Sequence, residues 1–467
     1  MAISKKLKEI VIVILSLSFF MASYIFDGVV ICEDSHSYIE GHLSREPFYP
    51  MLISLFRNWL GTEQDMYLKA LVFLQCLLWA ICTIIFVDYL TTEFDLKFLS
   101  SLIILALCLL PSVLCRFFAS RGSMYSNSIM TEGICIPLYL LFIRFLIDHG
   151  INRMKRDLVA ASVICLILIS TRKQMYVTLI LLALMIVYTG IKRSGEESVN
   201  SKKSIKTISK AFLSALVTVV LIIGLNRAYE YYYNSNLQTG TISHRNDNRF
   251  LTTVAFYVSE REDAEYIKED ETRELYLEIY DICESEGSMM HDSGKGLFEK
   301  ADHFADHYDM IQIDHMWPMF EGYAESKMTE IGETSKGPQE ELVDRISSDI
   351  TRAILPHRIP EVTGVFARNI IKGFGNTVAR SGRRYLPFVI PVYLIYLALM
   401  ILNIKKHTNE KLVFVSSVCL LAVAVNIFVT SAVIFPQVRY MIYNMPVFYS
   451  VLYLMIRKAL LRSDLLK

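Results

Sequence analysis

Long apolar runs separated by short polar stretches recur along most of this sequence. Most of the runs hold roughly 17–24 residues, enough for an α-helix to cross the hydrocarbon core of a bilayer. The pattern predicts an all-α integral membrane protein with about ten transmembrane helices. We expect them near residues 9–30, 67–90, 97–117, 126–147, 157–170, 174–190, 208–228, 385–404, 411–431 and 438–457. The fifth is short and could form one hairpin with the sixth, bent at Thr171–Gln174.

The first apolar run resembles a secretory signal peptide, because three lysines precede it and the residues from Ile10 to Phe26 carry no charge. The run is long, however, and no clear small-x-small cleavage site follows it. We therefore expect a retained first transmembrane helix.

Basic residues concentrate in alternate loops between the predicted helices, which is the positive-inside pattern. It predicts a multi-pass protein of the plasma or inner membrane with both termini in the cytoplasm. The residues expected inside are Arg153, Lys155, Arg156, Lys192, Arg193, Lys202, Lys203, Lys206, Lys210, Lys405, Lys406, Lys411, Arg457, Lys458 and Arg462.

One polar segment, residues 229–384, interrupts the apolar rhythm. It is acidic, with 29 Asp and Glu against 17 Lys and Arg, and parts of it have helical spacing. By alternation it lies outside, so we expect an extracytoplasmic, mainly helical domain. The chain then divides into a membrane domain at 1–228 with an outer loop at 27–66, the polar segment, and three further helices in 385–467.

Composition excludes several classes of function. The chain is 53% hydrophobic and its formal net charge is zero, so no basic surplus points to nucleic acid. No Walker A loop, GxGxxG or GxSxG motif is present. The nine cysteines are scattered and lie mostly in apolar runs, as buried small hydrophobic residues do.

The loop after the first helix carries two adjacent carboxylates, Glu33 and Asp34, followed by Tyr38. A carboxylate at the boundary of water and lipid can act as a base, because partial desolvation raises its pKa towards neutrality. The alternative is structural: Asp34 or Ser35 could cap a short helix that runs through Tyr38.

Four cations are expected on the outer face: Arg121, Arg172, Lys173 and Arg439. At this depth an Arg can bind a lipid phosphate in a bidentate manner. The alternative is ordinary anchoring of single basic residues at the headgroups.

Glu132 opens a middle helix, and a carboxylate at membrane depth is a functional candidate. The structural alternative is an ion pair with Arg116 or Arg121, or a favourable negative charge near the N-terminus of a helix. In the polar segment His303 and His307 have the spacing of half a zinc site, but the neighbouring aspartates favour a solvated acidic face. We therefore predict no metal and no cofactor.

Five short motifs occur in a fixed order and on one predicted side of the membrane. They are Asp34-Ser35-x-x-Tyr38, Arg45-x-Pro47-x-Tyr49-Pro50, Thr131-Glu132-Gly133, Thr171-Arg172-Lys173-Gln174 and Arg439-Tyr440 ahead of Pro446. This layout resembles the membrane glycosyltransferases of the C-type fold (GT-C), such as protein O-mannosyltransferases and the bacterial aminoarabinose transferase. The polar segment departs from the family, because many relatives carry their soluble part after the last helix.

The resemblance implies an inverting hexosyl- or pentosyltransferase that takes a sugar from a polyprenyl phosphate donor. The acceptor would be an extracytoplasmic glycan, lipid or protein of the cell envelope. Asp34 would be the general base, with Glu33 as the alternative and Asp27 a distant third. The same resemblance assigns the donor phosphate to Arg172, Lys173 and Arg439, and further substrate contacts to Tyr38, Arg45, Tyr49, Arg121 and Glu132.

Two rival functions remain open at this point. A glycan polymerase or ligase of the O-antigen type also has many helices and outer-loop arginines, but does not need the Asp34 loop. A transporter or lipid flippase would favour inverted repeats and charges near the middle of the membrane, whereas the polar groups here gather at one face.

Overall fold

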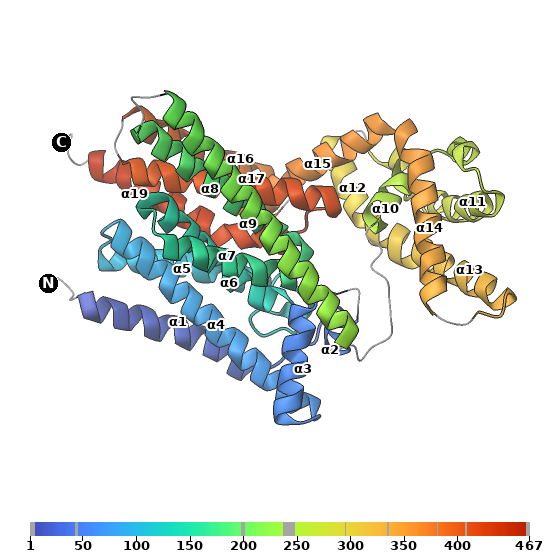
Figure 1. Ribbon diagram of the computed structural model, residues 1–467, viewed down its shortest axis with the longest axis horizontal. Helices are drawn as coiled ribbons and strands as arrows, with labels where there is room; N and C mark the ends of the chain where they lie inside the picture. The colour runs from blue at the N-terminus through green and yellow to red at the C-terminus, as the bar shows by residue number, and fades with distance from the viewer. Residues whose placement is uncertain are drawn as a thin grey trace.

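The computed structural model describes residues 5–42, 45–197, 201–236, 248–294, 296–333, 336–380, 382–406 and 409–463. Within them every regular element is a helix, and the β-structure is one isolated bridge between Val30 and Ser128. The all-α class predicted from the sequence is therefore confirmed (Figure 1). The α-helices are α1 (Lys5–Asp27), α2 (Ser35–Ile39), α3 (Phe48–Leu60), α4 (Gln64–Glu93), α5 (Phe98–Cys115), α6 (Glu132–Asn152), α7 (Lys155–Thr171), α8 (Tyr176–Glu197), α9 (Ser201–Asn236), α10 (Arg249–Val258), α11 (Asp270–Ser285), α12 (Leu297–Asp309), α13 (Trp317–Glu330), α14 (Lys336–Ile354), α15 (Ile359–Val378), α16 (Leu386–Lys405), α17 (Glu410–Val433), α18 (Val438–Met441) and α19 (Met445–Ser463).

Eight helices in the described residues are long and apolar enough to cross a membrane: α1, α4, α5, α6, α8, α9, α16 and α17. They indicate a multi-pass protein in a lipid bilayer. The two other expected helices also form, but α7 has 17 residues and α19 carries Arg457 and Lys458 near its end. About ten membrane crossings therefore stays a prediction.

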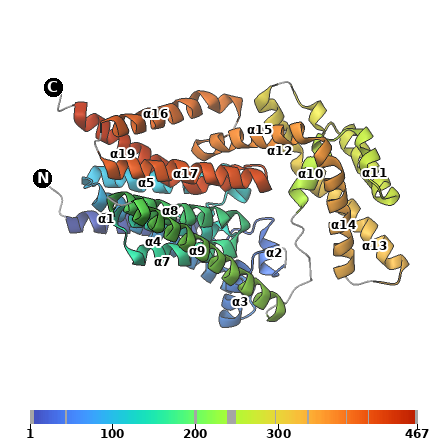
Figure 2. The same cartoon turned by 45° about the horizontal axis from the view of Figure 1, so that its top comes forward.

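Two hydrophobic cores hold the molecule together. The first fills the bundle of apolar helices, and the second lies among α10 to α14, where Tyr257, Tyr276 and Phe320 are buried. Helix α15 belongs to both, since Val365 packs in the second core and Val378 in the first. Figures 1 and 2 show the two groups of helices side by side, with α15 reaching from one to the other.

Local features of the bundle agree with the sequence pattern. Helix α7 ends at Thr171 and α8 begins at Tyr176 after a short 3₁₀ turn, which confirms the expected bend. Helix α3 is amphipathic: Ile53 is buried, whereas Leu55 and Trp59 are exposed. That exposed face is the one an interfacial helix would present to lipid.

Close packing of α8 on α9 yields a first prediction. A Cβ added to Gly190 would lie 2.1 Å from the Cβ of Ala211 on α9, so the two helices would have to separate. We expect Gly190→Ala to lower the free energy of unfolding by about 1–3 kcal/mol, the usual cost of overpacking. The measurement is thermal unfolding in detergent.

The matched control is Gly195→Ala on the same helix, where a new Cβ meets no atom within 4 Å. Alanine favours a helix over glycine, so this variant should be as stable as wild type or slightly more so. Equal loss in both variants would contradict the close α8–α9 contact.

Candidate functional site

The loop after α1 is pinned to the segment before α6. Cys32 N donates to Ser35 Oγ (2.8 Å), and Ser35 Oγ donates to the Ile129 carbonyl (2.9 Å). Helix α2 then begins, with Asp34 at its N-cap position but with no side-chain capping hydrogen bond. The capping interpretation of Asp34 and Ser35 is therefore wrong, and the Asp34 carboxylate is available for other partners.

Those partners are two arginines, one 11 positions from Asp34 and the other 405 positions away. Arg45 Nη2 lies 2.8 Å from Asp34 Oδ1, and Arg439 Nη1 lies 3.2 Å from Asp34 Oδ2. Burial raises the pKa of Asp34, but the charges of Arg45 and Arg439 together outweigh it, so the pKa is lowered below its usual value. The expected shift towards neutrality is wrong for this state of the protein, because the sequence did not show these two cations at the carboxylate.

Aromatic residues hold Arg45 in position. Its guanidinium lies 4.7 Å from the centre of the Tyr38 ring, and its Nε donates to Ser37 Oγ (2.7 Å). Tyr38 packs edge-on against Tyr49, whose hydroxyl donates to Gln75 Oε1 on α4 (2.6 Å). The structure thus brings Tyr38, Arg45 and Tyr49 together around Asp34, as a common site requires.

A second ion pair lies deeper. Glu132, at the start of α6, is fully buried, and its Oε1 lies 2.5 Å from Arg172 Nη1. Arg172 also donates to Thr131 Oγ1 (2.9 Å). The ring of Tyr440 lies 5.0 Å from Arg172 and 4.8 Å from Arg439, so it joins the two ion pairs.

Glu132 therefore has a different partner from the one its structural alternative named. The sequence left Arg116 and Arg121 as possible partners, but Arg116 pairs with Asp27 at the end of α1. A distant turn between α7 and α8 supplies the cation instead.

Three predicted residues lie apart from these ion pairs. Glu33 is exposed, and Arg121 is exposed in a turn with left-handed backbone (φ 54°). Lys173 lines a separate cavity of 610 Å³ together with Glu46 and Arg227.

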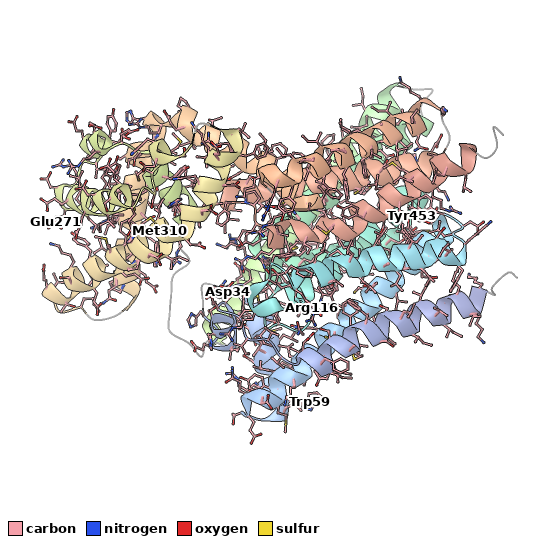
Figure 3. The ribbon with its side chains drawn as sticks, turned by 180° about the vertical axis from the view of Figure 1, so that it is seen from behind. Asp34, Trp59, Arg116, Glu271, Met310 and Tyr453 are labelled. Carbon is pink, nitrogen blue, oxygen red and sulfur yellow. The ribbon has the colours of Figure 1, made fainter. Side chains whose placement is uncertain are left out.

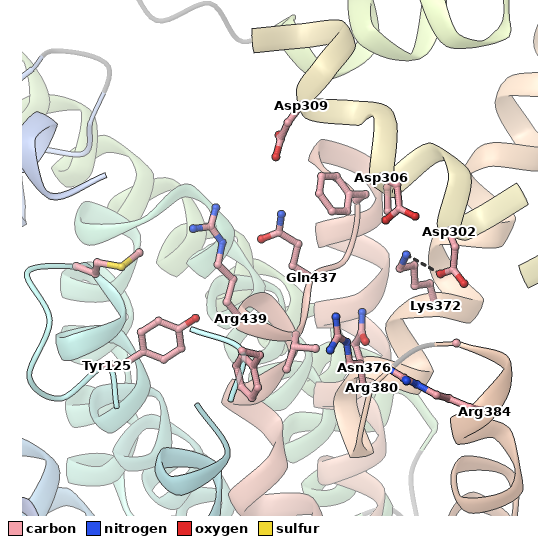
Figure 4. A pocket seen from close by; sticks show the side chains of 16 residues that line it. Tyr125, Asp302, Asp306, Asp309, Lys372, Asn376, Arg380, Arg384, Gln437 and Arg439 are labelled. Carbon is pink, nitrogen blue, oxygen red and sulfur yellow. Dashed lines mark hydrogen bonds and ion pairs between the residues drawn. The ribbon is translucent and has the colours of Figure 1, made fainter. Parts of the chain in front are cut away.

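A larger cavity of 740 Å³ opens next to Arg439, between the bundle and the polar segment. Its lining combines acids of α12 with bases of the bundle side, and the charged members are Asp302, Asp306, Asp309, Lys372, Arg380, Arg384 and Arg439. Figure 3 places Asp34 near the junction of the two groups of helices, and Figure 4 shows Asp309 and Arg439 projecting into the cavity from opposite walls.

The acidic wall of this cavity was missed in the sequence. Its aspartates recur every three or four residues, at 302, 306 and 309. This spacing is typical of a solvent-exposed helix face, so the sequence pattern alone predicts a solvated acidic surface. Lys372 binds Asp302 at 2.9 Å, while burial raises the pKa of Asp309 against the opposing effect of Arg439. Asp309 directly precedes a π-helical turn at Met310–Met316, a form often found at functional sites.

The histidines of the polar segment serve local structure. His303 Nε2 lies 3.1 Å from the Gly287 carbonyl, and the His303 and His307 rings stack at 4.1 Å. In the part of the chain that the structure describes, no group of three or more metal-ligating side chains is gathered.

Comparison with protein-family models, with curated proteins and with solved structures finds no match for this chain. The chemistry of the Asp34 ion pairs and of the adjoining cavity is therefore the basis for any function.

Proposed function

We propose that this protein is an inverting membrane glycosyltransferase that uses a sugar on a polyprenyl phosphate. The observation that carries the proposal is the position of Arg439, which contacts the Asp34 carboxylate and also lines the 740 Å³ cavity. A base and a phosphate-binding cation thus meet at one edge of a space large enough for a substrate. The motif resemblance to the GT-C enzymes supports the same reaction.

In the proposed reaction Asp34 accepts the proton of an acceptor hydroxyl. The acceptor oxygen attacks the anomeric carbon from the face opposite the phosphate, and the bond between that carbon and the phosphate oxygen breaks. The bonding electrons leave with the phosphate, and Arg439 stabilises the charge that develops there. Attack from the opposite face inverts the anomeric configuration.

The Asp34–Arg439 contact couples donor binding to the base. A donor phosphate near Arg439 competes with Asp34 for the same guanidinium. Loss of that contact removes one of the charges that lower the pKa of Asp34, so its carboxylate becomes a stronger base. Donor binding would in this way activate the base at the moment it is needed.

The remaining predicted residues take roles around this centre. Arg172 is engaged by Glu132, so it would act on the phosphate through the shared Tyr440 contact with Arg439. Tyr38 and Tyr49 would position Arg45 beside the base. Lys173 would reach a substrate only through the second cavity.

We further propose that both termini are cytoplasmic and that the polar segment is extracytoplasmic. The start of α1 and the end of α19 lie at the same end of the bundle, away from α10 to α14 (Figure 1). This arrangement supports the sidedness inferred from the basic loops.

Arg45 should set the acid limit of activity. It is one of the three arginine charges that lower the pKa of Asp34, so Arg45→Gln should raise that pKa and shift the acid limb of the kcat/KM profile to higher pH. Activity in mildly acidic buffer should fall, while activity well above the new pKa changes less. Arg45→Lys keeps the charge and should shift the limb less, and a profile unchanged in Arg45→Gln would remove Asp34 as the titrating base.

Transfer can be distinguished from transport in proteoliposomes. Wild-type protein is supplied with polyprenyl phosphate carrying a radiolabelled sugar, together with a crude envelope acceptor fraction. The proposal predicts that label leaves the lipid and polyprenyl monophosphate remains. A parallel sample receives the same sugar on a polyprenyl diphosphate. Consumption of that donor alone, with release of polyprenyl diphosphate, would favour a polymerase or ligase, and movement of intact lipid-linked label across the bilayer would favour a flippase.

A further inference from the structure

An apolar groove of 350 Å³ runs between α15 and α16, beside the large cavity. Phe374 and Gly375 of α15 form one wall, and Val389, Tyr393 and Leu394 of α16 form the other. The two helices are in direct contact along the side of the molecule (Figure 2). Because α16 is one of the candidate membrane spans, the groove opens where lipid tails would lie.

The groove and the cavity share two lining residues, Arg380 and Gly382, so they adjoin at the end of α15. Arg384, which also lines the cavity, follows a few residues later. Both arginines are exposed, and among the described residues no ion pair involves either of them. The apolar groove therefore ends at the Arg380 guanidinium, and the Arg384 guanidinium, which lies 5.0 Å from the centre of the Tyr385 ring, lines the adjoining cavity.

This combination fits an amphiphile with an apolar tail and an anionic head. Arginine binds phosphate with two parallel hydrogen bonds, whereas an apolar groove offers nothing to a headgroup. Beyond the arginines the cavity continues to Asp306 and Asp309, whose carboxylates are good acceptors for the hydroxyls of a sugar. The order of the lining, apolar then basic then acidic, matches the order tail, phosphate and sugar.

We infer that a polyprenyl phosphate lies in this groove, with its phosphate at Arg380 and Arg384 and its head directed towards Arg439. This inference rests on the proposed function for the identity of the lipid. It also gives the donor phosphate binding residues other than Arg172 and Lys173. Arg439 lines the same cavity and would contact the phosphate of the bound donor, as the proposed reaction requires. Arg380 and Arg384, which lie between α15 and α16, thereby become binding residues.

The test is photocrosslinking of the full-length protein in nanodiscs with a diazirine-bearing polyprenyl phosphate that carries no sugar. Crosslinked peptides should come from 371–394. Arg380→Gln/Arg384→Gln should weaken binding of this probe by roughly tenfold or more, because charge-assisted hydrogen bonds are lost. It should leave binding of the corresponding neutral polyprenol unchanged.

A groove variant tests the tail separately. Ile390 lines the groove and is 52% exposed, so Ile390→Trp should narrow the groove without disturbing the fold and should weaken both probes. Leu402→Trp on the same helix, also exposed but outside the groove, is the matched control and should bind normally.

Two results would overturn the inference: crosslinks that map outside 371–394, or competition by phosphatidylglycerol as effective as by unlabelled polyprenyl phosphate. The second would show an ordinary boundary lipid. Its failure is distinct from failure of the proposed function. Specific probe binding without sugar transfer would support the groove as a lipid site and contradict the proposed glycosyltransferase activity. Sugar transfer that is unchanged in Arg380→Gln/Arg384→Gln would support the activity and contradict the groove as the donor site.

Discussion

Glu132→Gln is expected to destabilise the protein by about 3–5 kcal/mol, because it leaves a buried arginine without its counter-ion. The Glu132 side chain is fully excluded from solvent, and its Oε1 lies 2.5 Å from Nη1 of Arg172, whose side chain is 14% exposed. The lost charge also weakens the support that Arg172 gives to Tyr440. Chemical denaturation in a mild detergent, followed by near-UV circular dichroism, would measure the change.

The double variant Glu132→Gln/Arg172→Met is the control for this effect. It removes both charges, and replacing a buried ion pair with apolar groups is often nearly neutral, so stability should largely return. If the double variant is as unstable as the single one, the loss comes from packing at α6, and the ion pair is not its cause.

Asp34→Asn should lower kcat by about 10²–10⁴-fold, the usual contribution of a general base. The amide keeps the size of the side chain and can still accept a hydrogen bond from Arg45, so the fold and donor binding should be retained. The separation of turnover from binding is what identifies a base. The measurement is steady-state turnover beside equilibrium donor binding, with stability checked by thermal unfolding.

Glu33→Gln is the matched control for this variant. Glu33 is the neighbouring carboxylate and is exposed, with no part in the Asp34 ion pairs described above. It should keep nearly full turnover. Loss of activity in Glu33→Gln with normal activity in Asp34→Asn would move the catalytic base to Glu33.

The local features of this chain were predictable from the sequence because they depend on short-range patterns. Helix type follows from apolar periodicity, and the bend after Thr171 follows from the polar break between two apolar runs. The start of the polar segment at residue 229 was predicted less accurately, because α9 continues to Asn236.

The site was only partly predictable, because its contacts join residues far apart in the chain. Asp34 and Arg439 are 405 positions apart, and no local pattern shows that they meet. The sign of the pKa shift at Asp34 depended on that meeting, so desolvation alone gave the wrong direction. The proposed role of Arg380 and Arg384 was likewise not predictable, because it depends on the groove and cavity that they line in the folded protein.

The central claim is tested most directly by offering the wild-type protein in nanodiscs a panel of radiolabelled polyprenyl phosphate sugars. The measurement is the polyprenyl phosphate released from each donor, with boiled protein as the blank. The account predicts that one donor is consumed and that its lipid phosphate accumulates in step with the sugar transferred or hydrolysed. If no donor in a broad panel is either bound or consumed, the protein is not a glycosyltransferase of this kind.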